Sequence, residues 1–438
     1  MPTPDPVAVQ QSEELRLNFF LNLRLNPGLA PFAVALLVLG AGNVQAQQKI
    51  TPPVATYWVS ADTASGLPMG DGAPLMMDLG RMMLGGGGAG GPVRTMLLEL
   101  GSQRAAGGTP AAAHEIPPGL RMGASLPLES PQRVRPEPRE DGPPEQFERP
   151  RGRLLIFWGC GEQAGPGQPF IVDFARLAQG EWPQGLFSRR VNVQRGPSPA
   201  RSKTYGEWPN ARDSQRVPAD ASLRGDHAVR GNYTPDIRFS LDRLDFMDAV
   251  TLSTARSGAD ARLSWNAVSG ATGYYASAMG GRDGSEDVVF WNSSASREFG
   301  DLLMTWLPPA EVARLVKERV VMAPATTECA VPAQFIAAAP MSFVRFITYG
   351  DEANFVHPPR PKDPAAVWNR EWAVKVRFKS TSSAMLGEEA AAAPRGRSRG
   401  AESAPPAEGA PAPGGSGLPS PADAVQEGIK VLRGIFGR

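Results

Sequence analysis

The sequence predicts a mainly β protein, and three observations lead to this prediction. Glycine and proline contribute 48 and 44 of the 438 residues, about a fifth of the chain, which would interrupt the helices of a bundle too often. Short apolar runs recur between Gly/Pro-rich turns, as strands do. Trp372 to Lys379 alternates apolar and basic residues with a period of two. We expect an irregular β-rich first domain, a β-sandwich with one short helix, and a disordered C-terminal tail.

The apolar runs give the expected strands in chain order. They lie at 54–60, 94–100, 154–158, 170–174, 237–241, 261–268, 274–279, 288–291, 343–349 and 372–379. Pro308-Pro309 predicts the start of the helix, because proline is tolerated in a first helical turn. In the last strand the apolar side should be buried, and Lys375, Arg377 and Lys379 should face water. The polar stretch 189–229 is expected to be an irregular surface excursion.

The N-terminus has the features of a secretory signal peptide. Arg16 and Arg24 precede the apolar run 29–39, which is shorter than the roughly 20 residues of a spanning helix. Small residues follow, which predicts cleavage between Ala46 and Gln47. Only 7 of the 45 basic residues are lysine, a bias typical of GC-rich bacterial genomes. We therefore expect an exported protein of the periplasm or cell surface of a Gram-negative bacterium, with no transmembrane span in the mature chain.

The composition divides the mature chain into four parts. Residues 47–229 should form the β-rich domain with long Gly/Pro loops, and 230–383 the sandwich. Residues 384–421 lack aromatic side chains and are expected to be disordered. Residues 422–438 regain a helical apolar stripe, which predicts a short amphipathic helix that docks on the protein itself, a partner or a lipid surface.

One stretch of the second half resembles a known family. Residues 263–275, LSWNAVSGATGYY, resemble the second and third strands of fibronectin type III-like domains, and a looser likeness extends over 236–380. The resemblance implies an immunoglobulin-like sandwich in which Trp265 is the core tryptophan and Tyr274 or Tyr275 points inward. Such sandwiches serve in adhesion, carbohydrate contact and spacing, so the fold does not choose among these roles.

The two cysteines, Cys160 and Cys329, leave two alternatives open. In an oxidising compartment they would form a disulfide that closes a long loop. Otherwise they are free thiols, and Cys160, between two glycines at a strand end, is then a candidate nucleophile. We predict the disulfide.

The remaining candidates for chemistry are weak. Methionines 69, 76, 77, 82, 83 and 96 could bind a soft metal such as copper. Three of them, Met76, Met82 and Met83, follow the spacing of a buried helix face together with Leu75 and Leu79, which favours packing. His114, His227 and His357 do not lie at metal-ligand spacing and are expected to be isolated. Trp368 is the tryptophan expected to be exposed, beside a Pro-rich loop.

These observations predict a non-catalytic protein without a cofactor or metal. The chain contains no P-loop, no G-x-S-x-G and no H-E-x-x-H motif. A formal net charge of +1 gives no electrostatic basis for nucleic-acid binding. We expect a structural or binding protein of the bacterial envelope, whose partner is an envelope protein or polysaccharide. The alternatives are soft-metal binding through the methionines and a hydrolase without a recognisable motif.

Overall fold

The computed structural model describes residues 48–67, 91–131, 152–181, 183–184, 186, 191–257 and 259–387. These residues belong to one compact unit that begins at Gln48, and they are mainly β, as predicted. The predicted signal peptide with its Ala46–Gln47 cleavage site, most of the Met-rich segment and the predicted C-terminal helix 422–438 lie outside the described residues.

Sixteen strands are present in the described part of the chain. In the first half they are β1 (Ala55–Gly66), β2 (Val93–Ser102), β3 (Ala112–Glu115), β4 (Ser125–Leu128), β5 (Arg153–Trp158), β6 (Phe170–Asp173), β7 (Thr204–Trp208), β8 (Gly225–Gly231) and β9 (Ile237–Leu241). In the second half they are β10 (Leu252–Ser257), β11 (Asp260–Trp265), β12 (Gly273–Gly281), β13 (Val288–Asn292), β14 (Glu328–Val331), β15 (Met341–His357) and β16 (Trp372–Leu386). The helices are short: α3 (Phe174–Ala178), α4 (Pro309–Lys317) and α5 (Ala333–Ala338), with 3-10 turns η1 (Pro118–Leu120) and η2 (Asp301–Met304).

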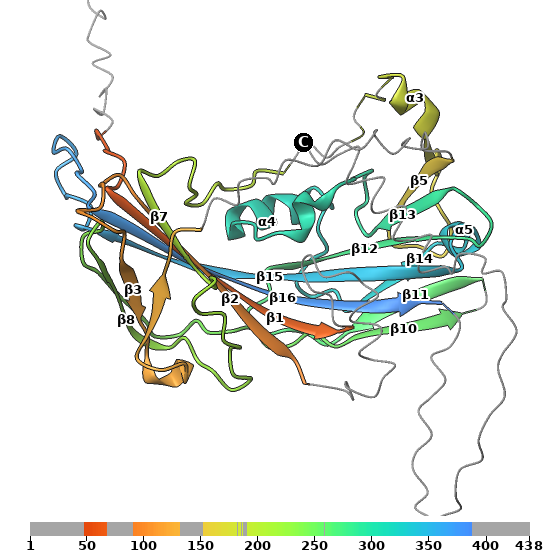
Figure 1. Cartoon of the computed structure of the whole chain (residues 1–438). Coiled ribbons are helices and arrows are strands. Elements are labelled where there is room, and N and C mark those ends of the chain that lie inside the picture. The colour runs from red at the N-terminus through yellow and green to blue at the C-terminus, as the bar shows by residue number, and fades with distance from the viewer. Residues whose placement is uncertain are drawn as a thin grey trace, which may run out of the picture. The chain divides into compact units, whose positions relative to one another are not determined.

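A nine-stranded sheet organises the unit (Figure 1), in the order β6-β5-β13-β12-β15-β16-β1-β2-β7. Neighbouring strands are antiparallel except for the parallel pairs β1–β16 and β5–β13. Both parallel pairs join a strand of the 47–229 segment to a strand of the 230–383 segment. A single sheet therefore includes both halves of the chain.

Two smaller sheets cover one face of the large sheet. The four-stranded sheet β4-β3-β8-β9 lies against the end that contains β1, and the three-stranded sheet β10-β11-β14 lies against the end that contains β12. Their contacts are aromatic: Phe239 of β9 packs on Tyr57 of β1, with 6.5 Å between ring centroids, and Trp265 of β11 packs on Phe346 of β15 at 4.6 Å. The main hydrophobic core lies between these layers.

Helix α4 covers the opposite face of the large sheet (Figure 1). It begins at Pro309, where the missing backbone N–H costs no helical hydrogen bond, as the sequence predicted. Its apolar stripe, Val312 and Leu315, is fully buried against Tyr275 and Ile347 of the sheet. Successive residues of a strand face opposite sides, so Phe346 belongs to one core and Ile347 to the other.

The expectation that Lys375, Arg377 and Lys379 face water is wrong. The apolar side of β16 is buried as predicted, but the side chains of these three residues keep only 12, 15 and 12% of their exposure. Tryptophan rings and paired carboxylates from distant segments cover them, and the period-two pattern carries no information about such neighbours.

The stretch 189–229 is more regular than expected. It contains β7, which pairs with β2, and most of β8, which pairs with β3 and β9. Short strands β3, β4, β10 and β14 lacked a continuous apolar run and were not predicted. At the other end, β16 continues to Leu386, so the first residues of the segment predicted to be disordered belong to a strand, and 388–438 lie outside the described residues. Among the described residues no helix is long and apolar enough to cross a membrane.

Candidate functional site

The fold brings two histidines together under the four-stranded sheet. His114 lies on β3 and His227 on the neighbouring β8, and both side chains point inward, toward β1. The Nε2 of His114 lies 2.9 Å from the Nδ1 of His227, and the Nδ1 of His114 lies 2.9 Å from the hydroxyl of Tyr57. The expectation of isolated histidines is therefore wrong for this pair, which is 113 residues apart in the chain.

The hydrogen bonds of the two histidines all run in one direction, and the Leu223 carbonyl determines which direction this is. The Nε2 of His227 lies 2.7 Å from the carbonyl oxygen of Leu223, which can only accept, so this nitrogen carries the hydrogen. In a neutral imidazole the Nδ1 of His227 must then accept from the Nε2–H of His114. The Nδ1 of His114 in turn accepts from the Tyr57 hydroxyl. We call this row of groups, from Tyr57 to the Leu223 carbonyl, the histidine chain.

The surroundings keep the histidine chain neutral. His114 is fully buried and His227 is 2% exposed. Burial, aided by the neighbouring His227, holds the pKa of His114 well below its usual range. Burial also lowers the pKa of His227, although the hydrogen bond to Leu223 and the charge of Asp226 oppose this shift. Burial raises the pKa of Tyr57 far above its ordinary value, so its hydroxyl stays protonated.

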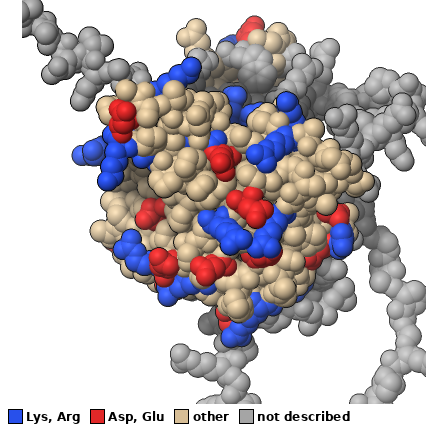
Figure 2. All heavy atoms as spheres, turned by 90° about the vertical axis from the view of Figure 1, so that its left-hand side faces the viewer, with Lys and Arg blue, Asp and Glu red and all other residues tan. Residues whose placement is uncertain are grey.

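A surface hollow of about 530 Å³ reaches the histidine chain from outside. Its lining is Glu115, Ile116, Asp226, His227, Ala228, Arg230, Arg238 and Phe239. Arg230 pairs with Glu115 at 3.2 Å, while His227 stacks flat on Phe239 with centroids 4.7 Å apart. The end of the molecule that carries β3, β7 and β8 shows basic and acidic side chains interspersed, without a patch of one sign (Figure 2).

The hydrogen bonds of the two histidine rings are all made within the protein. Every ring nitrogen of the pair already has a hydrogen-bond partner within the protein, so neither ring offers a lone pair to a substrate or metal ion. Among the described residues no group of three or more His, Cys, Asp or Glu is placed to hold a metal.

A second polar cluster lies on the face of the nine-stranded sheet opposite to the histidine chain, and we call it the charge ladder. It consists of Lys375, Arg377 and Lys379 of β16 with Glu352 of β15, Glu99 of β2 and Asp62 of β1. The three N···O distances are 2.5 Å for Lys375–Glu352, 3.9 Å for Arg377–Glu99 and 3.5 Å for Lys379–Asp62.

Two indoles enclose the middle of the charge ladder. The guanidinium carbon of Arg377 lies 4.5 Å from the ring centroid of Trp58 and 4.7 Å from that of Trp306, so the group makes cation–π contacts with both rings. Its Nε donates to the hydroxyl of Ser60 at 2.7 Å. Burial lowers the pKa of Arg377 to about 10 and raises the pKa of Glu99, despite the mutual attraction of the two groups. For the Arg377–Glu99 pair, the effect of desolvation on both pKa values is therefore larger than the effect of the attraction between the two charges.

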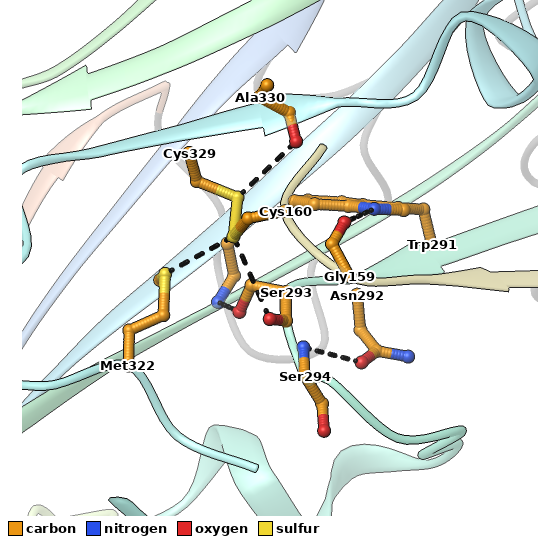
Figure 3. Close-up of a disulfide and its surroundings, with 10 residues drawn as sticks. Gly159, Cys160, Trp291, Asn292, Ser293, Ser294, Met322, Cys329 and Ala330 are labelled. Carbon is orange, nitrogen blue, oxygen red and sulfur yellow. Dashed lines mark hydrogen bonds between the residues drawn. A yellow bond between two sulfur atoms is a disulfide. The ribbon is translucent and has the colours of Figure 1, made fainter. Parts of the chain in front are cut away.

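The sulfur atoms of Cys160 and Cys329 lie 2.10 Å apart, at disulfide distance (Figure 3). Cys160 follows β5 of the large sheet, and Cys329 lies on β14 of the three-stranded sheet. The bond thus joins two sheets through residues 169 apart in sequence. Both cysteines are used, which leaves Cys160 no thiol with which to act as a nucleophile while the bond is present.

The loop that carries Cys160 is held on both sides. The Gly159 carbonyl accepts from the indole Nε1 of Trp291 at 3.0 Å (Figure 3), and the Gly161 N–H donates to the Ala330 carbonyl at 3.0 Å. Cys329 is 3% exposed, whereas Cys160 is exposed and borders a hollow of about 420 Å³. Met322 places its sulfur 3.7 Å from that of Cys160.

The other predicted candidates show little sign of a site. Met96 is buried in the main core, and the remaining methionines of the proposed copper cluster lie outside the described residues. His357 is exposed and stacks on Trp372 with centroids 5.4 Å apart. Trp368 is half-buried, donates from its Nε1 to the Pro358 carbonyl at 2.9 Å and is flanked by the guanidinium groups of Arg360 and Arg370. It anchors a loop rather than offering a bare platform.

Sequence reasoning missed the histidine chain and the charge ladder, although one signal was present. His227 alternates with Val229, and His114 alternates with Ala112 and Ile116, which is the pattern of inward positions on a short strand. Comparison with known protein families gives no match, and no curated protein matches the chain.

Proposed function

We propose that this protein is an exported, non-catalytic structural or binding protein of the bacterial envelope. The observation that carries the proposal is the cysteine pair at disulfide distance, because structural disulfides persist in oxidising compartments and are rare in the cytosol. The signal-peptide pattern of residues 1–46 and its Ala46–Gln47 junction support the same location. The internal pairing of the histidine chain supports the absence of a catalytic role.

We further propose that residues 252–386 form a fibronectin type III or immunoglobulin-like module. In such sandwiches strands A, B and E share one sheet and C, F and G the other. The order β10-β11-β14 matches A, B and E, and the order β12-β15-β16 matches C, F and G, with β13 as an additional strand beside β12. The resemblance implies that Trp265 and Tyr274 both point into the core, and their ring centroids lie 5.6 Å apart there. Strands β5 and β6 extend the second sheet at one edge and β1, β2 and β7 extend it at the other, which is suited to a spacer or a contact surface.

The proposal is tested by the intact mass of the protein recovered from separated cell fractions of a Gram-negative host. We expect a periplasmic or surface chain that begins at Gln47, takes up no alkyl group before reduction and takes up two after it. A Cys329→Ser variant should take up one alkyl group without reduction, because Cys160 is exposed. An uncleaved cytosolic chain with two freely alkylated thiols would contradict export.

The binding role is tested separately from export. The mature protein is mixed with insoluble envelope polysaccharide, sedimented, and assayed in parallel on ester, peptide and glycoside substrates. Co-sedimentation without turnover is the expected result. Sustained turnover that survives further purification would replace the binding proposal with the hydrolase alternative.

A further inference from the structure

The histidine chain links two sheets. Tyr57 belongs to β1 of the nine-stranded sheet, whereas His114 and His227 belong to β3 and β8 of the four-stranded sheet. The end of the row is fixed by the backbone of Leu223, whose N–H donates to the carboxylate of Asp245 at 2.8 Å. The packing of the two sheets at this point therefore includes a buried polar row whose hydrogen bonds all run in one direction.

We propose that protonation of the His114–His227 pair is an acid-sensitive switch that loosens the four-stranded sheet from β1. The proposal goes beyond the envelope role and does not depend on it. It rests on the position of the pair between two sheets, on the fixed direction of its hydrogen bonds and on the hollow that leads to His227.

The neutral chain has no place for an additional proton. If the Nδ1 of His227 is protonated, it becomes a donor that faces the Nε2–H of His114, and two donors cannot bond to each other. The row can then persist only by inverting, with the Nδ1–H of His114 donating to the Tyr57 oxygen. The hydroxyl hydrogen of Tyr57 would lose its acceptor, since the described residues provide this group with no other hydrogen bond. A buried imidazolium is costly in addition.

The hollow gives the proton its route. His227 is the ring that lines it, and His114 lies behind His227. The titratable and charged groups around the pair are Tyr57 of β1, Glu115 of β3, Asp226 and Arg230 of β8, Tyr233 after β8, Arg238 of β9 and Asp245 beyond β9. Asp226 favours a charged His227, but burial is the larger influence on that ring. Protonation is therefore coupled to opening of the sheet, where water can solvate the charge.

Another connection determines which strands should open. Residue Glu129, next to β4, forms two backbone hydrogen bonds with Glu207 of β7, at 3.1 and 2.9 Å, and so ties β4 to the large sheet. The strands farthest from this tie are β8 and β9. Acid should loosen β8 and β9 most and β4 least.

The test is amide hydrogen exchange on the full chain at pH 7.5, 6.5 and 5.5, with exchange times scaled for the intrinsic pH dependence. Below the ordinary histidine pKa of 6.5, the opening equilibrium of β8 and β9 should rise about ten-fold per pH unit for each proton taken up. The strands β10 and β11 serve as the internal reference. The double variant His114→Gln with His227→Gln should lose this pH dependence, whereas His357→Gln, which changes the exposed third histidine, should retain it.

Three results would overturn the switch. They are equal exchange of β8 and β9 at all three pH values, an acid response spread evenly over β10 and β11, and a pH dependence that survives in the double variant. If the double variant does not fold, the proposal is tested on the wild-type protein by following the imidazole proton signals of the histidines by NMR as the pH is lowered. The rings of His114 and His227 should remain neutral in the folded protein at pH 5.5, and titration of both near pH 6.5 without added exchange would refute the proposal.

Discussion

Two successive residues of β1 belong to two different polar clusters, a neutral one and a charged one, on opposite faces of the nine-stranded sheet. Tyr57 points to the small sheets and ends the neutral histidine chain, while Trp58 points to the other face and stacks on Arg377 of the charge ladder. Both clusters are largely removed from water. The histidine chain has one acceptable proton arrangement, whereas the charge ladder is a set of overlapping attractions with partial exposure.

The difference lies in redundancy. In the histidine chain each nitrogen has a single partner, so the loss of any member leaves an orphaned buried atom. In the charge ladder Glu352 contacts Lys375, accepts from Asn354 at 3.0 Å and also attracts Arg377. Removal of one member should therefore destabilise the protein most in a buried polar cluster where each group has a single hydrogen-bond partner, and less where a group has several partners.

The largest effect should follow removal of the central ring. His114→Ala leaves the Tyr57 hydroxyl and the Nδ1 of His227 without partners and opens a cavity, which together cost about 4 kcal/mol of unfolding free energy. Urea unfolding at pH 7.5 measures it. The matched change at the exposed histidine, His357→Ala, should cost less than about 1 kcal/mol. Equal losses of unfolding free energy in the two variants would mean that the hydrogen bonds of the histidine chain do not stabilise the protein.

A smaller effect should follow removal of a single hydroxyl. Tyr57→Phe leaves the Nδ1 of His114 without its donor and should cost about 1–2 kcal/mol at pH 7.5. Tyr275→Phe is the control, because the Tyr275 hydroxyl is buried without a hydrogen-bond partner among the described residues. Its removal should be neutral or stabilising in the same thermal or urea assay. If Tyr275→Phe proved the more damaging change, the hydrogen bond assigned to Tyr57 would have no energetic weight.

The sequence predicted local features of this molecule better than distant ones. The alternation of Trp372, Val374, Val376 and Phe378 located β16 and its buried side. The same pattern placed Arg377 in water, because nothing within the strand shows that Trp58 and Trp306 cover it. Binary patterning reports which side of a strand is apolar, and it does not report what covers the polar side.

The candidate sites show the same limit. The disulfide could be predicted because the chain has only two cysteines and so only one possible pair. His114 and His227 could not be paired in the same way, since their contact requires β3 and β8 to be neighbours. Both strands are short; β3 lies in a stretch rich in alanine, glycine and proline, and β8 lies in a polar stretch. Such pairings are determined by the whole sheet rather than by local propensity.

The smallest expected effect tests the charge ladder. Burial raises the pKa of Glu99, which means that the folded protein disfavours its ionised form relative to the unfolded chain. The penalty is absent below the ordinary pKa of 4.5, grows as the pH rises through the raised value and is constant above it. A neutral analogue, Glu99→Gln, should therefore stabilise the protein at pH 8, by at most about 1 kcal/mol because the side chain keeps some solvent and Arg377 loses a partner. The unfolding free energies of the two proteins should converge as the pH falls toward 4.5. A loss of about 3 kcal/mol at pH 8 would instead show that the Arg377–Glu99 pair is essential, and that the charge ladder has no more redundancy than the histidine chain.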